Sequence, residues 1–451
     1  MVFIVIYLTR GIVLIKKKEY LESKKFLQSS ALVSVLSLFV SFINVFRDFL
    51  IAYYFGSSHL TDAYWLASVA PIFLFNVFSS ITTVVFVPMF IQVSQDGLKN
   101  LYSFFFHIFK KTVFFISLIS VAVSLVFFSY FFWSESFSEV TFVIFALLLF
   151  GSIIQTLSHL FKSLFLSRRK YFKGSVSSFF SALVTVTILV FFQNKIGIYA
   201  IPISFIFSYI FEFFLVLFIA FREGVFSNFN KNNFHNKKID LSTKKFIINT
   251  FFAVLFMYLA LTVDQLMARS LGDGAITLLT YGNKMSQFLM GVLGTGIGVV
   301  ALSEFSLKLS SKDFIAAQKL MKKISFFVFL LTVPVVLLGV AVSEPLLSFV
   351  FKNSKLTESD LLVVSSINQI YLIQLIPYLV SLVGVRFIYA TKKIHLIMKI
   401  GIVNLFTNIL GNLIFMKWIG LEGIALSTVI VYLVSGILIF YFVSRIDFNL
   451  E

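Results

Sequence analysis

Ionisable side chains occur in segments of this chain that are otherwise apolar enough to lie in lipid. Arg47 and Asp48 are adjacent in the segment FRDFLIAYYFG, and Asp62 follows a short Gly-Ser turn. Lys284 lies midway along a later apolar run. Such groups are costly in hydrocarbon unless they face a partner or a water-filled cavity. Guanidinium and ammonium groups in a cavity suit phosphate-bearing ligands. The sequence therefore predicts an anion site, with an interhelical salt bridge as the alternative.

A second polar group could hold a cation. Asn404, Asn408 and Asn412 stand four residues apart in KIGIVNLFTNILGNLIF, so they share one face of a helix. In lipid this polar stripe must face protein or water. One interpretation is interhelical hydrogen bonding, which such residues commonly supply. The other is a cation site of amide oxygens, with Asp264 providing the negative charge.

Further ionisable residues fall within or near apolar runs. Glu212 and Arg386 lie deep enough to form a structural ion pair. Glu304 and Arg269 lie near the ends of their runs, where long side chains reach the headgroups. A role in substrate binding is not required to explain Glu304 and Arg269, whereas the sequence leaves the roles of Glu212 and Arg386 open.

No catalytic constellation is recognisable. The chain has no cysteine, and it shows no clustered histidines, no Walker loop and no metal-ligand spacing. A membrane ligase or polymerase would need a large outer loop with catalytic side chains, and the longest outer loop we predict, about 343–362, lacks Arg and His. Transport driven by an ion gradient or the membrane potential fits better than catalysis or ATP hydrolysis.

The composition places the chain in a membrane. Of 451 residues, 59% are hydrophobic and 13% are charged, whereas soluble proteins carry about 25% charged residues. The apolar runs are continuous and do not alternate, which argues against a β-barrel. Runs of about 20 residues can cross a bilayer as helices. We predict an all-α fold with about twelve spans: 30–55, 62–93, 105–131, 140–162, 174–193, 197–221, 246–269, 276–303, 324–342, 363–390, 396–416 and 421–444.

The charge distribution orients these spans. A formal net charge of +17 could indicate nucleic acid, but Lys and Arg gather in the loops of one side, as they do on the cytoplasmic side of membrane proteins. The opposite loops hold Lys195, Lys352, Lys355 and Lys417. The sequence predicts a multi-pass protein of the cytoplasmic membrane, with both termini in the cytoplasm and no nucleic-acid partner.

The chain also reads as two related halves. DFLIAYYFGSSHLT (48–61) resembles DQLMARSLGDGAIT (264–277), so Asp48 and Asp264 are equivalent positions. We predict a cytoplasmic or interfacial segment (1–29), a six-helix half (30–221), a basic linker (222–245) and a second half (246–451). Halves of equal orientation imply a pseudo-twofold axis along the membrane normal and a central cavity between them.

Two motifs resemble those of the MurJ/MviN lipid II flippase family, part of the multidrug/oligosaccharidyl-lipid/polysaccharide exporter superfamily. The first is FRDFLIAYYFG followed by TDAYWLASVAP, and the second is YGNKMSQFLMGVLGTGIGVVALSEFS. The resemblance covers the chain from about residue 30 to the end. It implies a MATE-like fold, a monomer, and alternating-access export of an undecaprenyl-pyrophosphate-linked saccharide for cell-wall biogenesis.

The resemblance also implies roles for individual residues. In the family, cavity positions match Arg47, Asp62 and Lys284, with Asp48 beside the first. A sodium site of some members, in which Na⁺ or H⁺ would be the coupling ion, matches Asp264, Asn404, Asn408, the backbone carbonyl of Ile424, and Thr428. From these roles we expect the cavity to present Arg47 and Lys284 to the pyrophosphate. We expect Asp62 to pair with Arg47 when no ligand is bound, and so to help close the outer gate.

The chain departs from the family pattern in several places. Ser41 and Phe75-Asn76 stand where the family usually has arginines, and Asn408 stands where it has an acid. Lipid II flippases mostly have fourteen spans, whereas this chain ends after about twelve, as do O-antigen and capsule flippases. Such a repeat-unit flippase is the nearest alternative. A multidrug/cation antiporter would need acids in the cavity, and the basic Arg47 and Lys284 argue against it.

Overall fold

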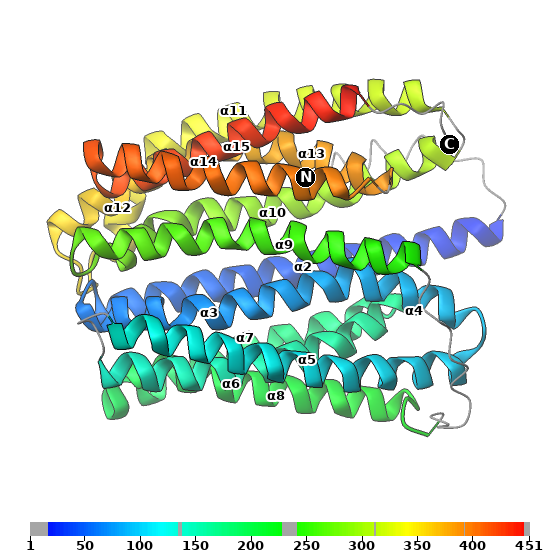
Figure 1. The fold of residues 1–451 in the computed structure, drawn as a ribbon, viewed down its shortest axis with the longest axis horizontal. Helices are drawn as coiled ribbons and strands as arrows, with labels where there is room; N and C mark the ends of the chain where they lie inside the picture. The colour runs from blue at the N-terminus through cyan, green and yellow to red at the C-terminus, as the bar shows by residue number, and fades with distance from the viewer. Residues whose placement is uncertain (1–16, 134–137, 228–240, 311–312, 392, 446–451) are drawn as a thin grey trace.

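The computed structural model describes residues 17–133, 138–227, 241–310, 313–391 and 393–445. Residues 1–16 of the predicted N-terminal segment and residues 228–240 of the predicted linker therefore lie outside the described residues. The division into two halves at this linker stays a prediction, and we use 'first half' and 'second half' only as names for the helices before and after it. Figure 1 shows long helices lying roughly alongside one another, with no strand in the described ranges.

The helices of the first half run from α2 to α8. They are α2 (Lys17–Phe55), α3 (His59–Ile81), the π-helix η1 (Thr82–Phe86), α4 (Val87–Ser94), α5 (Leu98–Trp133), α6 (Glu139–Ser167), α7 (Tyr171–Ile196), the 3₁₀ turn η2 (Gly197–Tyr199) and α8 (Ala200–Arg222). α3, η1 and α4 follow one another without a loop, so together they form one long crossing.

The helices of the second half run from α9 to α15. They are α9 (Leu241–Ala268), the 3₁₀ turn η4 (Arg269–Leu271), α10 (Ala275–Ser310), α11 (Phe314–Phe351), α12 (Glu358–Ile373), α13 (Leu375–Ala390), α14 (His395–Ile419) and α15 (Leu421–Ser444). In Figure 1, α9 and α10 lie next to α2 and α3, where the two sets of helices meet.

The described residues contain 11 segments that are long and apolar enough to cross a membrane. One of them, Tyr171–Arg222, has 52 residues and contains both α7 and α8. These two helices pack against each other around a turn at Gly197, where φ is +56°. Since each is longer than the roughly 20 residues that a crossing needs, the segment crosses twice. The prediction of an all-α fold with about twelve spans is confirmed.

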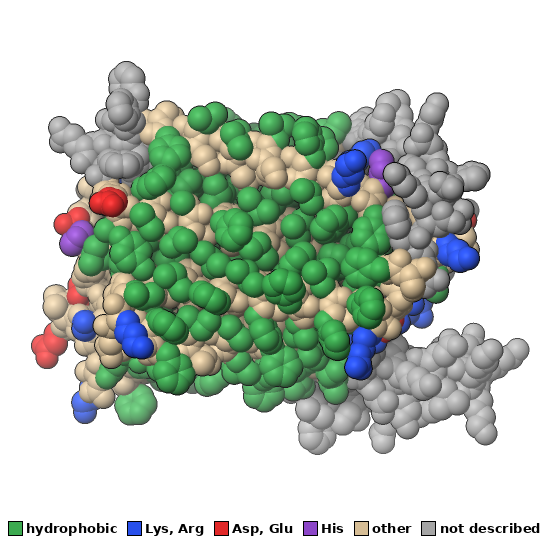
Figure 2. Space-filling model, turned by 90° about the horizontal axis from the view of Figure 1, so that it is seen from below, with side chains coloured by type: hydrophobic (Ala, Val, Ile, Leu, Met, Phe, Trp, Pro, Cys, Tyr) green, Lys and Arg blue, Asp and Glu red, His purple; other side chains and the backbone are tan. Residues whose placement is uncertain are grey.

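The outer surface of the bundle is apolar. Figure 2 shows hydrophobic side chains across the middle of one face, with charged side chains near the two ends. Large side chains such as Phe191, Phe214 and Phe349 are 69%, 64% and 79% exposed. A soluble protein would not expose such an extensive apolar surface, so this belt faces lipid.

Buried apolar side chains form one core shared by both halves and further cores within each half. The shared core includes Leu50 and Leu66 from the first half and Ile276 and Val364 from the second. It lies near the end that carries residues 56–58, 272–274 and 352–357, which we call the predicted outer end. Away from this end, the clusters around residues 90–225 and 301–443 are separate. A small cluster joins α3 and α9 there. The halves are therefore packed most extensively together at the predicted outer end.

Candidate functional site

A buried carboxylate joins the two halves near the middle of the bundle. Asp48 of α2 is 5% exposed. Its Oδ1 atom accepts hydrogen bonds from Nε and Nη2 of Arg47 at 2.9 and 2.7 Å. Its Oδ2 atom lies 2.9 Å from Nζ of Lys284, on α10. We call these three residues the cationic triad. Its two positive charges and one negative charge leave a net charge of about +1 at the junction of the halves.

Both cations of the triad also lie over aromatic rings. The Arg47 guanidinium is 4.8 Å from the ring centre of Phe205, and the Lys284 ammonium is 4.8 Å from that of Trp65. Cation–π contacts of this kind hold a charged group in place without neutralising it. We did not predict either ring, because both residues lie in apolar runs where the sequence does not show which face points inward.

The fourth predicted residue of this site, Asp62, does not contact the cationic triad and instead binds the start of α10. Its carboxylate accepts hydrogen bonds from the backbone N–H of Gly274 at 2.7 Å and of Thr277 at 2.9 Å, and from the Thr277 hydroxyl at 2.6 Å. It thereby caps the N-terminus of α10, where a negative charge is favoured. The expected pair between Asp62 and Arg47 is therefore wrong for this conformation. Asp62 instead ties α3 of the first half to α10 of the second.

Two further contacts close the predicted outer end. The Ser57 hydroxyl donates to Oδ2 of Asp360, at the start of α12, at 2.7 Å. Gly56 has a φ of +63°, and a Cβ there would lie 2.7 Å from the carbonyl oxygen of Lys355. Glycine is thus required both by the backbone conformation and by the close approach. With the Asp62 cap, these contacts form what we call the outer seal.

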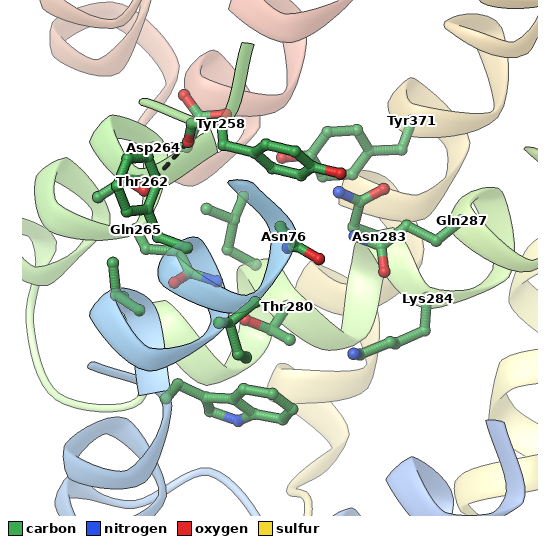
Figure 3. Close-up of a pocket in the computed structure, with 15 residues that line it drawn as sticks. Asn76, Tyr258, Thr262, Asp264, Gln265, Thr280, Asn283, Lys284, Gln287 and Tyr371 are labelled. Atoms are coloured by element: carbon green, nitrogen blue, oxygen red, sulfur yellow. Dashed lines mark hydrogen bonds between the residues drawn. The ribbon is translucent and has the colours of Figure 1, made fainter. Parts of the chain in front are cut away.

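A cavity of about 310 Å³ lies between the halves, on the other side of the triad from the seal. Figure 3 shows Lys284, Asn283 and Gln287 on one side of it, and Asp264, Thr262 and Gln265 on the other. The full lining is Trp65, Val69, Ile72, Phe73, Asn76, Tyr258, Thr262, Asp264, Gln265, Leu279, Thr280, Asn283, Lys284, Gln287 and Tyr371. Arg47 does not line this cavity, so the expectation that it meets the ligand there together with Lys284 is not met in this conformation.

The polar lining of α10 carries a signal that sequence analysis could have used. Thr280, Asn283, Lys284 and Gln287 follow the spacing i, i+3, i+4 and i+7, which puts them on one face of a helix. The prediction considered Lys284 alone and missed the polar residues beside it. Their shared face would have indicated a wet cavity rather than a single buried charge.

Asp264 of α9 lies at a second polar site, within the second half. It is 5% exposed. Its Oδ1 atom accepts from the side-chain amides of Asn408 and Asn412 of α14 at 2.8 and 2.7 Å, and its Oδ2 atom accepts from the Thr428 hydroxyl of α15 at 3.1 Å. The structure therefore brings together Asp264, Asn408 and Thr428, as predicted from the resemblance. Asn412, which belongs to the predicted polar stripe but not to the ion site that the resemblance implies, joins them.

The residues at Asp264 carry the oxygen types that hold a monovalent cation, although in this conformation the amide nitrogens of Asn408 and Asn412 face the carboxylate. Within the described ranges, the side-chain oxygens of Asn404, Asn408 and Asn412 are buried and accept no hydrogen bond. Buried acceptors without a donor are rare and require explanation. The backbone carbonyl oxygen of Ile424 lies in the same cluster, 3.2 Å from the Thr428 hydroxyl oxygen. Carboxylate, amide and hydroxyl oxygens are the ligands that hard cations prefer.

The other buried charges do not pair as suggested. Glu212 of α8 accepts from Lys162 of α6 at 2.8 Å and from Ser178 of α7 at 3.0 Å, all within the first half. Arg386 lies on α13 in the second half, against Gly298 of α10. The proposed ion pair between Glu212 and Arg386 is therefore wrong. Sequence spacing alone does not show which helix faces pack against each other within a half.

Comparison with known proteins agrees with this architecture. The family model described as lipid II flippase MurJ matches residues 51–448. A probable lipid II flippase MurJ of Buchnera aphidicola subsp. Schizaphis graminum is 25% identical over 433 residues, which is 92% of this chain and 82% of the relative. Another, from Buchnera aphidicola subsp. Baizongia pistaciae, is 22% identical over 428 residues, covering 89% of this chain and 80% of the relative.

Solved structures show the same fold. A lipid II flippase MurJ in an inward closed conformation has a TM-score of 0.74 at 23% identity, covering 92% of this chain and 88% of that one. An inward-facing multidrug resistance MATE transporter of the MOP superfamily has a TM-score of 0.68 at 12% identity, covering 89% and 97%. The helical fold, with a cavity between its halves, is that of a polytopic membrane transporter. The chain belongs to the lipid II flippase MurJ family.

Proposed function

We propose that this protein moves lipid II, an undecaprenyl-pyrophosphate-linked saccharide, from the inner to the outer leaflet of the cytoplasmic membrane by alternating access. The observation that carries this proposal is the position of Lys284. Its ammonium lies in a cavity between the halves, within membrane-spanning helices, and is held by the buried carboxylate of Asp48. A cation at this depth is costly and marks a substrate path.

Asp48 stabilises the positive charges of Arg47 and Lys284 while no ligand is bound. Between ligands, Lys284 and Arg47 share this carboxylate, so neither cation is left without compensation. When a pyrophosphate arrives, its oxygens offer Lys284 a stronger partner, because phosphate carries more negative charge than one carboxylate. Asp48 then remains paired with Arg47. The polyprenyl tail stays in lipid, because its transfer into a polar cavity would be unfavourable.

Release to the other leaflet requires the outer seal to open. Asp62 must leave the N-terminus of α10, and Ser57 must part from Asp360. Both termini lie in the cytoplasm in this proposal, so the seal faces outward. An inside-negative potential then favours outward movement of the anionic headgroup by about 2.3 kcal/mol per charge per 100 mV.

A monovalent cation, Na⁺ or H⁺, is proposed as the coupling ion at Asp264. Asp264, Thr428 and the amide oxygens of Asn404, Asn408 and Asn412 would hold it, and the ion would compensate the buried negative charge. This part of the proposal has a test that does not depend on transport. Sodium should raise the melting temperature of the purified protein relative to choline at equal ionic strength, since a ligand that binds the folded state stabilises it.

The substrate is tested by mass spectrometry of lipid-linked intermediates after depletion of this protein in its own host. Accumulation of lipid II is expected and would place the protein in peptidoglycan biosynthesis. Accumulation of another undecaprenyl-linked glycan, with lipid II unchanged, would overturn the substrate assignment. It would indicate a flippase for an O-antigen or capsule repeat unit.

A further inference from the structure

The cavity wall around Lys284 is almost entirely neutral. Among its lining residues, Lys284 and Asp264 are the ionisable groups of opposite charge, and they lie on opposite sides. The rest of the polar wall consists of side-chain amides, hydroxyls and tyrosines. A pyrophosphate alone would be bound better by further cations. This wall therefore suits a second, uncharged part of the ligand.

Three amide side chains of the wall have no hydrogen-bond partner in the part of the chain that the structure describes. They come from three helices: Asn76 from α3, Gln265 from α9 and Gln287 from α10. Each amide offers two donors and one acceptor group. Within the membrane, such groups need water or a ligand to satisfy them. Their alternating donors and acceptors match the hydroxyl and acetamido groups of a sugar.

Trp65 supplies the apolar surface that a sugar ring needs. The indole lines the cavity and is 5% exposed. It is held by Tyr64, at 4.7 Å between ring centres, and by Tyr281, which packs edge-on at 6.3 Å. The ring is thus fixed before any ligand binds. The C–H face of a pyranose packs on such a rigid aromatic face, while its hydroxyls reach the polar groups around it.

Trp65 and Lys284 are neighbours in the cavity, so a sugar on the indole would lie next to a phosphate on the ammonium. The ammonium of Lys284 lies 4.8 Å from the centre of the Trp65 ring and covers its face. In a pyrophosphate-linked saccharide, the first sugar is joined directly to the phosphate that would bind this ammonium. Movement of Lys284 toward the phosphate uncovers the indole at the place where the first sugar must lie.

We propose that Trp65 and the amides of Asn76, Gln265 and Gln287 form a saccharide subsite for the first sugar of the lipid-linked substrate. This inference rests on the proposed function and deepens it. Lys284 recognises the pyrophosphate that all such lipids share. Trp65 and the amides distinguish a lipid that carries a sugar from one that has delivered it.

The test compares the binding of two lipids to the full chain in nanodiscs. The probes are undecaprenyl pyrophosphate and the same lipid carrying one sugar, with affinities measured by native mass spectrometry. The unmodified chain should prefer the sugar-bearing lipid by about tenfold, the upper range for one aromatic contact. W65L should reduce this preference to less than about twofold, while its affinity for the sugar-free lipid stays within about twofold. Q287L should reduce the preference by about threefold, as expected for one neutral hydrogen bond.

Fluorescence gives an independent measurement. The chain has three tryptophans, so replacing Trp133 and Trp418 by Phe leaves Trp65 as the sole reporter. The sugar-bearing lipid should protect this indole from acrylamide quenching more than the sugar-free lipid does. W418L is the matched control for W65L, because Trp418 is 76% exposed on α14. It should keep the full preference for the sugar-bearing lipid.

Failure of the subsite differs from failure of the proposed function. If both lipids bind, K284A weakens both equally and W65L keeps the preference, the saccharide subsite is overturned and the pyrophosphate site stands. Equal quenching with the two lipids would also overturn the subsite. If the unmodified chain binds neither lipid, the proposed function fails, and the subsite with it.

Discussion

Asp48 and Asp264 occupy equivalent positions in the two predicted halves, yet they have partners of different charge. Both are 5% exposed and both lie in membrane-spanning helices. Asp48 contacts two cations, Arg47 and Lys284. Asp264 contacts two asparagine amides and a threonine hydroxyl. A buried charge in hydrocarbon must be compensated. At Asp48 two protein cations do this, whereas at Asp264 the protein supplies neutral hydrogen-bond donors, and the proposed coupling ion would add the positive charge.

This difference explains how one fold can hold ligands of both signs. At Asp48 the protein carries an excess positive charge, so an anion that displaces the carboxylate from Lys284 is favoured. At Asp264 no cation of the described residues pairs with the carboxylate, which accepts only neutral hydrogen bonds, so a cation or proton is favoured. Lys284 and Asp264 lie on opposite sides of one cavity (Figure 3). Changing the charge at either site should therefore affect one ligand far more than the other.

Removing the cavity cation should have the largest effect on transport. K284A deletes the contact to pyrophosphate, and a hydrogen bond to a charged group contributes about 1.5–3 kcal/mol, or about ten- to 150-fold in binding. We expect export to fall below detection in a complementation assay that follows lipid-linked precursors. The protein should still insert, because Asp48 keeps Arg47 as a partner.

K284R is the matched variant. It retains the charge but changes the shape of the donor, so partial export is expected. Export at the normal rate by K284A, at an equal amount of inserted protein, would contradict a role for this ammonium in substrate binding.

Neutralising the second aspartate should separate ion binding from substrate binding. D264N keeps the size of the side chain and removes its charge, so the sodium-dependent rise in melting temperature should disappear. At a sodium concentration about 100 times the Kd, this rise corresponds to about 2.7 kcal/mol of stabilisation. Binding of undecaprenyl pyrophosphate should stay within about threefold. A sodium response that survives in D264N would exclude Asp264 as the ion ligand.

The sequence shows the buried charges more clearly than their partners. Arg47, Asp48, Asp264 and Lys284 stand out because any charge in an apolar run is costly, whatever the tertiary structure. The membrane fold follows from the length and composition of the runs. These features are local, so a single chain suffices to predict them.

Partners that depend on the register of distant helices could not be predicted in the same way. Asp62 caps a helix that begins more than 200 residues later, and its own sequence neighbourhood favoured Arg47 instead. The ring of Trp65 becomes part of the site because α10 crosses it at Lys284. Neither contact has a spacing rule along the chain.

A third buried carboxylate extends the comparison, because Asp62 is compensated by a helix N-terminus rather than by an ion. D62A removes three hydrogen bonds of the outer seal. Loss of a helix cap costs about 1–2 kcal/mol, so the outward-open population should rise about five- to thirtyfold.

The absence of cysteine from the chain allows this shift to be measured. Thr280 lines the cavity, so T280C places a single thiol there. A membrane-impermeant thiol reagent added outside should label this thiol faster when D62A is also present. A substitution outside the seal, S270A, should leave the labelling rate of T280C unchanged. Unchanged labelling with D62A would show that the cap does not limit opening.

Glu212 completes the set as a buried acid whose partners all lie in one half. Its contacts to Lys162 and Ser178 join α8 to α6 and α7 and do not reach the cavity. E212Q should therefore lower the melting temperature, because it leaves Lys162 without a carboxylate, a loss of up to about 3–5 kcal/mol for a buried pair. Transport per inserted molecule should not change, because alternating access moves the two halves relative to each other and the contacts of Glu212 all lie within one half. Export that falls further than the amount of inserted protein would show that the interior of the first half takes part in transport.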